Sequence, residues 1–324
     1  MRSNRRKFIL QSGQLALGLG LLGCSPTSSS EKNDSANDVI TEKDLFFKIS
    51  LAQWSLNKDF FDKKLDNLDF AMKAKKDFGI EAIEYVNQFF GDKAKDKDYL
   101  GQMKTRAADH GVESLLIMID SEGNLGATND KERKTAVENH YKWVEAAQFL
   151  GCHSIRVNAF GVGTADEVSA AAIDGLGSLA TFAKDFDINV IVENHGSYSS
   201  DGNWMINVMK QINMDNCGML PDFGNFCVER TSGKQWDGDC IKEFDRYEGV
   251  ELFMPFAKAV SAKSHDFDKD GNETKTDYLK MMKIVKDAGY TGYVGVEYEG
   301  KELSPDDGIR ATKALLEKVG RELG

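Results

Sequence analysis

Short apolar stretches alternate with longer amphipathic stretches along most of the chain. Segments with apolar residues at helical spacing include Asn67–Phe78, Lys131–Leu150, Ala165–Phe186, Leu279–Ala288 and Asp306–Leu323. Apolar or β-branched runs bounded by turn residues predict eight strands, at Phe47–Gln53, Ile80–Val86, Val112–Ile119, His153–Ala159, Ile188–Asn194, Cys217–Asp222, Ala259–Ser264 and Gly292–Glu297. Strands that alternate with helices are typical of a parallel α/β architecture.

Glycine follows several predicted helices just before the next strand, as at Gly79, Gly111, Gly151 and Gly289. Glycine past a helix end permits the left-handed cap that stops the helix. Eight strand-helix units in about 250 residues predict an α/β fold of the (β/α)₈ TIM-barrel class. A doubly wound sheet is the alternative, but no G-x-G-x-x-G phosphate turn follows the first predicted strand.

The N-terminal residues have a different pattern. Basic residues, among them Arg5 and Arg6, precede an apolar run from Phe8 to Leu22 that ends in Gly23-Cys24. The RRKFI segment resembles a twin-arginine (Tat) signal, and LLGC resembles a bacterial lipobox. We therefore expect residues 1–24 to be an export signal with Cys24 as the lipidated residue.

Residues 25–44 are small and polar, so we expect a flexible tether there and a barrel over residues 45–324. This arrangement predicts an exported protein on a bacterial membrane, on the periplasmic side, that touches the membrane through its lipid anchor only. The sequence leaves open which membrane carries it and which oligomer it forms.

Composition narrows the classes of function. Hydrophobic residues at 41% and charged residues at 29% are typical of a folded globular chain. The net charge of −11 disfavours nucleic acid as a partner. Apart from Cys24, the chain has Cys152, Cys217, Cys227 and Cys240, whose spacings match no zinc pattern. We expect them to be mostly buried small hydrophobic residues, and their pairing stays open.

Four consecutive predicted strands of the second half end in a residue suited to metal or acid-base chemistry. These are Glu193 in VIVENHG, Asp222 in MLPDFGN, His265 in SAKSHDF and Glu297 in VGVEYEG. In a barrel, side chains at the carboxyl ends of the strands converge on one open face. Each residue alone also fits a rim hydrogen bond or a turn, but together they predict one cavity.

Three carboxylates in one cavity repel each other unless a positive charge lies between them. Oxygen ligands with one imidazole favour Mn²⁺, Mg²⁺ or Co²⁺, so we predict a divalent metal held by Glu193, Asp222, His265 and Glu297. Such a metal polarises a carbonyl group and stabilises an enediolate. Glu193 and Glu297 are then the predicted catalytic pair that removes and returns a proton.

From about Lys48 to the C-terminus, the chain resembles the xylose-isomerase-like superfamily of sugar phosphate isomerases and epimerases. The segments VENHG, PDFGN, AKSHDF and VEYEG carry the resemblance, with LAQWSL at the first strand. The resemblance to its ketose 3-epimerase branch implies the same four metal ligands and the same two proton-transferring glutamates. That branch has a substrate-binding histidine three positions after the Asp, where this chain has Asn225.

Further polar residues at strand ends are candidates for contacts with a small sugar or keto-sugar: Glu84, Asn158, His195, Asn225 and Lys263. Trp54 and the pair Phe89-Phe90 are candidates for stacking on a sugar ring or for packing. The loops after Ser264 and Glu297 are mainly acidic, which disfavours a phosphorylated substrate.

These features predict a metal-dependent sugar isomerase or epimerase. One alternative is a lyase that eliminates the aglycone from a 3-keto-glycoside through the same enediolate. Another is a lipid-anchored barrel that binds sugars without turnover. An endonuclease for abasic DNA shares the expected fold but needs a histidine-rich zinc site, and the chain has only five histidines. The ligands do not distinguish isomerase, epimerase and lyase, and they leave the sugar and the metal open.

Overall fold

The computed structural model describes residues 45–324. The predicted export signal, lipidation site and tether lie outside these residues. Eight parallel strands form one sheet: β1 (Lys48–Ala52), β2 (Ala82–Val86), β3 (Glu113–Met118), β4 (Ser154–Val157), β5 (Asn189–Glu193), β6 (Cys217–Leu220), β9 (Val260–Ser264) and β10 (Tyr293–Tyr298). These strands match the eight predicted ones with shifts of a few residues at their ends.

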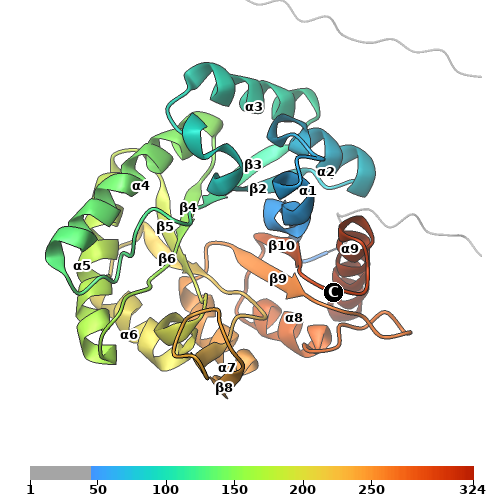
Figure 1. Cartoon of the computed structure of the whole chain (residues 1–324). Helices are drawn as coiled ribbons and strands as arrows, with labels where there is room; N and C mark the ends of the chain where they lie inside the picture. Colours follow the sequence, from blue (N-terminus) through green and yellow to red (C-terminus); the bar gives the residue numbers. More distant parts are fainter. Residues whose placement is uncertain (1–44) are drawn as a thin grey trace, which may run out of the picture. The chain divides into compact units, whose positions relative to one another are not determined.

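Helices cover the outside of this sheet (Figure 1). They are α1 (Asn57–Phe61), α2 (Phe70–Phe78), α3 (Lys97–Asp109), α4 (Asp130–Leu150), α5 (Ala165–Lys184), α6 (Gly202–Ile212), α7 (Arg246–Phe253), α8 (Tyr278–Asp287) and α9 (Pro305–Leu323). Gly79 and Gly151 cap α2 and α4 with φ values of 65° and 85°, in the left-handed region that glycine adopts without strain. Within residues 45–324, no helix combines the length and apolar character that a membrane span requires.

The sheet closes into a barrel. Its strand order is β6-β5-β4-β3-β2-β1-β10-β9, so β6 and β9 are the two edges. Parallel bridges join Met219 to Ala257 and Asp222 to Ser261 across these edges. The backbone N–H of Ser261 donates to Pro221 O, and that of Phe223 donates to Ser261 O. The predicted (β/α)₈ TIM-barrel class is therefore confirmed.

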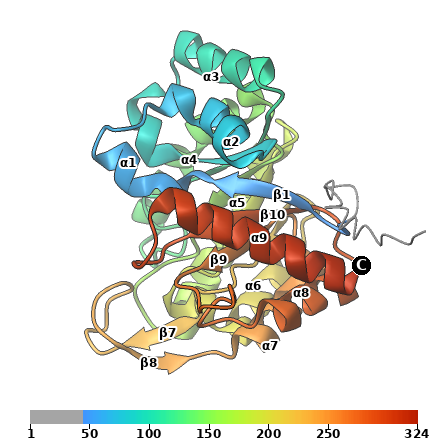
Figure 2. The ribbon, with the colours of Figure 1, turned by 90° about the vertical axis from the view of Figure 1, so that its right-hand side faces the viewer.

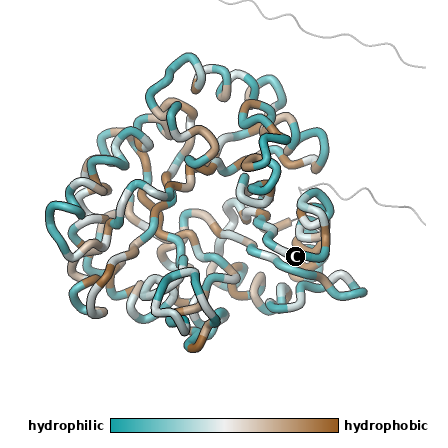
Figure 3. Tube along the Cα trace, viewed as in Figure 1, coloured by the Kyte–Doolittle hydropathy of each residue, from teal (hydrophilic) through white to brown (hydrophobic). Residues whose placement is uncertain are grey.

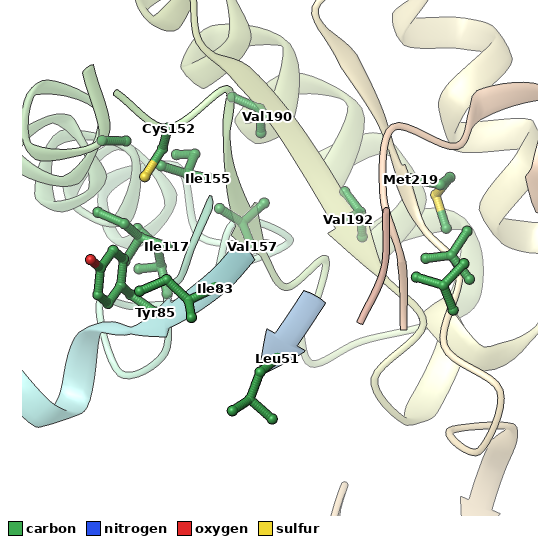
Figure 4. Close-up of a cluster of buried hydrophobic side chains, with 14 of the residues drawn as sticks. Leu51, Ile83, Tyr85, Ile117, Cys152, Ile155, Val157, Val190, Val192 and Met219 are labelled. Carbon is green, nitrogen blue, oxygen red and sulfur yellow. The ribbon is translucent and has the colours of Figure 1, made fainter. Parts of the chain in front are cut away.

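Strand alternation separates two apolar clusters. One side of the strands carries residues such as Ile83, Ile117, Ile155 and Val192, which pack with the helices in a large core (Figure 4). The opposite side faces the barrel interior and carries a smaller cluster that includes Leu116, Ile191 and Leu220. Hydrophobic colouring follows the strands, and hydrophilic colouring dominates the outer turns (Figure 3).

Two further strands lie outside the barrel. Strands β7 (Cys227–Arg230) and β8 (Cys240–Glu243) pair antiparallel between β6 and α7. In Figure 2, this hairpin projects at the side toward which β1 points, the carboxyl end of the parallel strands. The hairpin was not predicted from the sequence, because its strands are four residues long and partly polar.

Candidate active site

Three carboxylates meet at the carboxyl end of the barrel. Glu193 ends β5, Asp222 follows β6, and Glu297 lies in β10. One oxygen of each lies within 4.8 Å of the other two, a spacing at which they could hold a metal ion. All three residues are buried, with exposures of 3% or less. They meet because each takes an inward-facing position of a parallel strand or follows directly after one.

Hydrogen bonds hold each carboxylate in place. Asn225 Nδ2 donates to Glu193 Oε1 at 3.0 Å. Asp222 Oδ1 accepts from two backbone N–H groups of the turn that follows it, at 2.8 and 2.9 Å. The hydroxyl oxygen of Ser261 lies 2.7 Å from Asp222 Oδ2 and 2.7 Å from Glu297 Oε2. Ser261 therefore bridges two of the three carboxylates.

Lys263 supplies positive charge to the same group. Its ammonium nitrogen lies 3.4 Å from Glu297 Oε1, 3.3 Å from Glu299 Oε2 and 4.0 Å from Asp222 Oδ2. Burial works against its charge, but the carboxylates, led by Glu297, raise the pKa of Lys263 well above its usual value. Lys263 is thus a buried cation, 3% exposed, among carboxylates.

Arg156, on β4, is the second buried cation. Its Nη1 donates to Asp120 Oδ1 at 2.9 Å. Its Nε lies 2.8 Å from Glu193 Oε2, an ion pair in which the N–H is not aligned as a hydrogen bond. Although burial opposes the shift, Arg156 holds the pKa of Asp120 below its usual range. Asp120 and Glu193 therefore share one guanidinium group.

Burial changes the acidity of the carboxyl groups in the barrel. It is the main cause that raises the pKa values of Glu193, Asp222 and Glu297 above their usual range. Burial also raises the pKa of Glu84 to about 7. A carboxyl group whose pKa is raised toward neutrality suits general acid-base chemistry.

His265, the predicted imidazole ligand, does not join the three carboxylates. Ser261 and Lys263 take the inward positions of β9, and the strand ends at Ser264. His265 lies in the loop that follows, where its backbone N–H donates to Glu273 Oε1 and its Nδ1 lies 3.9 Å from the same oxygen. The side chain that the barrel interior receives from this segment is therefore Lys263.

A cavity of about 570 Å³ opens beside the three carboxylates; Glu297 lines it, whereas Glu193 and Asp222 lie behind its wall. Four of the predicted substrate-contacting residues line it, namely Asn158, His195, Asn225 and Lys263. Glu84, the fifth, is fully buried and accepts a hydrogen bond from Ser50 Oγ at 2.6 Å. Glu84 does not line this cavity, so it belongs to the barrel interior beneath it.

A polar network forms one wall of the cavity. Asn158 Nδ2 donates to Asp120 Oδ1 at 2.8 Å, and its Oδ1 lies 2.8 Å from His195 Nδ1. Burial, helped by the charge of Arg156, lowers the pKa of His195 to about 3. The imidazole is therefore neutral at physiological pH.

Several residues of the cavity were not predicted from the sequence. Arg156 interrupts an apolar strand at an inward position, and Asp120 lies two residues after the end of β3. Both positions carried a usable signal, since a charged residue in a buried strand needs a partner and a carboxylate just past a strand end faces the open side of the barrel. Glu299 lies two residues after Glu297, accepts a hydrogen bond from Trp54 Nε1 and lines the cavity with it.

The two phenylalanines beside the cavity differ in position. Phe89 stacks on Trp54 with ring centroids 6.3 Å apart, whereas Phe90 is buried and packs edge-to-face against Trp143. Neither Phe89 nor Phe90 lines the cavity, so Trp54 is the member of this aromatic set that a ligand meets.

The hairpin of β7 and β8 forms a rim over the cavity. Gln235 Nε2 donates to the backbone carbonyl of His195, and the Trp236 ring lies 4.4 Å from the His195 ring. Cys227 and Cys240 form a disulfide that closes the hairpin. The expectation of buried, small hydrophobic cysteines therefore holds for Cys152 and Cys217 and is wrong for Cys227 and Cys240, whose pairing the sequence left open.

The predicted divalent metal fits this arrangement only in part. The three carboxylates are close enough to hold an ion, but the imidazole expected as the fourth ligand lies elsewhere. The ammonium of Lys263 lies beside two of the three carboxylates instead. A divalent cation bound to the carboxylates would lie next to the positively charged ammonium of Lys263, and the repulsion between the two cations is unfavourable. The donor set therefore does not fit the predicted metal as long as Lys263 is protonated and stays in place.

Residues 72–319 match the family described as "Xylose isomerase-like TIM barrel". This match covers most of the chain, so the protein belongs to that family. No curated protein matches the chain in sequence.

Several solved structures share the fold. A D-psicose 3-epimerase, solved in the presence of D-fructose, is 13% identical with a TM-score of 0.64 over 85% of this chain and 100% of its own. A 3-keto-D-glucoside 4-epimerase from E. coli is 14% identical with a TM-score of 0.59 over 84% and 99%. A barrel from Mycobacterium smegmatis in complex with magnesium is 15% identical with a TM-score of 0.61 over 86% and 98%. At these identities the likeness is one of fold.

Proposed function

We propose that this xylose isomerase-like TIM barrel is a sugar isomerase or epimerase that moves a proton beside the carbonyl group of a small sugar or keto-sugar. One observation carries the proposal: Glu193 and Glu297 come from separate strands and meet within 4.8 Å at the same buried position. Neighbours in fold that are sugar epimerases support this class of substrate.

In the proposed mechanism, a carboxylate carries out each proton transfer. One glutamate removes the proton from the carbon next to the carbonyl, and the electron pair moves onto the carbonyl oxygen to form an enediolate. Return of a proton to the opposite face of the same carbon gives the epimer. Return to the former carbonyl carbon, with a proton moved between the two oxygens, gives the isomer. Asn225 and Ser261 keep Glu193 and Glu297 in place for these transfers.

Positive charge beside the carbonyl oxygen stabilises the enediolate. The sequence predicts Mn²⁺, Mg²⁺ or Co²⁺ in this role, and one structural neighbour was solved in complex with magnesium, but the donor set of this site does not fit such an ion. The described side chains that supply positive charge at the carboxylates are Lys263 and Arg156.

Elimination from a 3-keto-glycoside is the second candidate. The cavity reaches from Glu297 and Lys263 to the exposed Trp236 on the rim, which offers a surface for the aglycone. In this reaction the enediolate forms in the same way, and its electron pair then expels the aglycone from the next carbon. The two candidates therefore share Glu193 and Glu297 and differ in their product.

Exchange of substrate hydrogen with solvent tests the proposal. The purified protein is incubated in D₂O with a panel of ketoses and 3-keto-glycosides, and deuterium in the sugar and any released aglycone are followed by NMR and mass spectrometry. We expect deuterium at a carbon beside the carbonyl of at least one sugar. A sugar-dependent rise in melting temperature without any exchange would show a binding protein and contradict the proposal.

Glutamine variants connect this exchange to the two residues. Glu193→Gln and Glu297→Gln are each expected to slow it by about 10²–10⁴-fold, the usual range for loss of a general acid or base. Glu145→Gln, at an exposed position of α4, is the matched control and is expected to exchange at the wild-type rate. Wild-type exchange in either site variant, with folding verified by circular dichroism, would remove that residue from the mechanism.

We also propose that the chain is exported and anchored through a lipid on Cys24. The disulfide of Cys227 and Cys240 supports export, since disulfides form and persist in oxidising compartments. Metabolic labelling with a fatty-acid analogue is expected to label the wild type and not Cys24→Ser. Equal labelling of both proteins would contradict the proposal.

A further inference from the structure

We propose that Lys263 is the resident cation of this site: its ammonium group, rather than a divalent metal ion, offsets the carboxylates and stabilises the enediolate. The catalytic part of this inference rests on the proposed function. The part that concerns the occupant of the site stands on the geometry alone.

The fold directs Lys263 into the barrel beside the carboxylates. Lys263 follows Ser261 by two residues on β9, so both side chains point into the barrel. A Cβ atom built on Gly224 would come within 3.0 Å of Lys263 Cδ and 3.1 Å of Cγ. Glycine at position 224 therefore lets the turn after Asp222 approach the lysine stem closely.

Neighbouring carboxylates offset the cost of burying the ammonium. A lysine that is 3% exposed is costly unless its charge is paired, and here Glu297, Glu299 and Asp222 lie between 3.3 and 4.0 Å from Nζ. The ammonium therefore forms ion pairs with these carboxylates at the edge of the cavity, and this geometry suits electrostatic stabilisation of a negative charge that develops on a bound sugar.

Lys263 and a divalent ion compete for the same space. Metal-oxygen distances are about 2.0–2.6 Å for Mg²⁺ and Ca²⁺. An ion bound to Asp222 and Glu297 would therefore lie within a few ångströms of the ammonium, whose distances to these residues are 4.0 and 3.4 Å. His265, which would complete a metal site, lies at Glu273 instead. The position that the fourth ligand of the metal ion would need is therefore held by an ammonium group, which has the same sign of charge as the ion.

The chemistry follows from the position of Lys263 on the cavity wall, next to Glu297 and Glu299. The ammonium donates a hydrogen bond to the carbonyl oxygen of the sugar. When a glutamate takes the neighbouring proton, the carbonyl oxygen gains the negative charge and this hydrogen bond strengthens. The proton then returns from the carboxylic acid to carbon, and Lys263 ends the cycle with the protons it had at the start.

Metal content and thermal stability test the occupant independently of activity. The purified full chain is analysed for metals by mass spectrometry before and after dialysis against EDTA, and the dialysed protein is melted with and without 1 mM Mn²⁺, Mg²⁺ or Co²⁺. We expect less than a tenth of an equivalent of any metal and an unchanged melting temperature. About one equivalent of metal in the isolated protein, lost to EDTA with a fall in melting temperature, would overturn the proposal.

Three variants sharpen this test. Lys263→His removes the ammonium and adds an imidazole, so we expect Mn²⁺ to raise the melting temperature of this variant. Lys263→Met is expected to lose solvent exchange into the sugar by at least about 10²-fold, and Lys263→Arg to retain more of it than Lys263→Met because it keeps the charge. Lys134→Met, at an exposed position of α4, is the matched control.

The outcomes separate this inference from the proposed function. Failure of the wild type to exchange any sugar would end the proposed function, yet the metal and melting results would still report on Lys263. Full exchange in Lys263→Met, or exchange in the wild type that EDTA abolishes and Mn²⁺ restores, would overturn the inference and leave Glu193 and Glu297 in their roles. If Lys263→Met does not fold, Lys263→His and Lys263→Arg carry the test.

Discussion

The floor of the cavity is buried in the barrel, whereas its rim is an exposed hairpin. The floor consists of charged side chains at the ends of β4, β5, β6, β9 and β10, and each is 4% exposed or less. The rim is the hairpin of β7 and β8; its second strand is exposed along its whole length, and the loop between the strands carries the exposed Trp236. The floor gains its order from the barrel, whereas the rim has a disulfide.

This difference separates two tasks. Proton transfer requires groups held in a fixed geometry, and buried strand ends supply that geometry. Recognition of a substrate tolerates adaptable contacts, and loops at the carboxyl face of a barrel vary without disturbing the strands. We therefore expect substitutions in the floor to affect stability and the rate of proton transfer, and substitutions in the rim to affect the choice of substrate.

The largest effect on stability should come from Arg156→Met. Removing the guanidinium leaves Glu193 and Asp120 without their shared cation, and loss of one partner of a buried ion pair costs about 3–5 kcal/mol. Urea denaturation at pH 7 measures the free energy of unfolding. Arg321→Met, on the exposed face of α9, is the control. A loss of less than about 1 kcal/mol would mean that the floor does not depend on this pair.

Glu84→Gln tests the floor through pH. The pKa of Glu84 is about 7 in the folded protein, above its ordinary value of 4.5, so the folded state holds this proton more tightly. Its contribution to stability is present below pH 4.5 and is lost as pH rises to 7, by up to about 3 kcal/mol. The variant has no such proton to lose.

The measurement for Glu84 is the free energy of unfolding of both proteins at pH 5 and pH 8. Between pH 5 and pH 8, we expect the free energy of unfolding of Glu84→Gln to rise relative to that of the wild type. The same change with pH in both proteins would place the pKa of Glu84 near its ordinary value.

The disulfide defines the rim. Cys227 and Cys240 are separated by 13 positions, and a cross-link over a loop of this size stabilises it by about 3 kcal/mol. In the double variant Cys227→Ser/Cys240→Ser we expect faster proteolysis between residues 228 and 239. The melting temperature of the barrel should change little, since the hairpin lies outside the eight-stranded sheet. Loss of the whole barrel in this variant would show that rim and floor are not independent.

Trp236→Ala should have the smallest effect. An aromatic contact contributes about 1 kcal/mol, so we expect the KM for a 3-keto-glycoside to rise roughly fivefold. The KM for a monosaccharide should stay unchanged, because Trp236 lies at the rim and not beside Glu297. An equal rise for both substrates would place the monosaccharide site at the rim.

Local patterns in the sequence were sufficient for the barrel and for most of its floor. Apolar runs between amphipathic helices indicate the strands, and the position of Glu193, Asp222 and Glu297 at strand ends brings them together in any closed parallel barrel. The strand end at β9 shows the limit of such patterns. His265 and Lys263 are two residues apart and both fit the inward side, so the pattern alone favours the better metal ligand.

The choice between these two side chains belongs to tertiary contacts. Strand β9 ends at Ser264 because the chain turns there toward Glu273, and Gly224 in the neighbouring turn leaves space for a lysine stem. The pairing of Cys227 with Cys240 and the contact of Trp236 with His195 arise in the same way, from segments that fold back over the barrel. Periodicity reports which side of its own strand a residue faces, and it carries no information about the segments that meet it there.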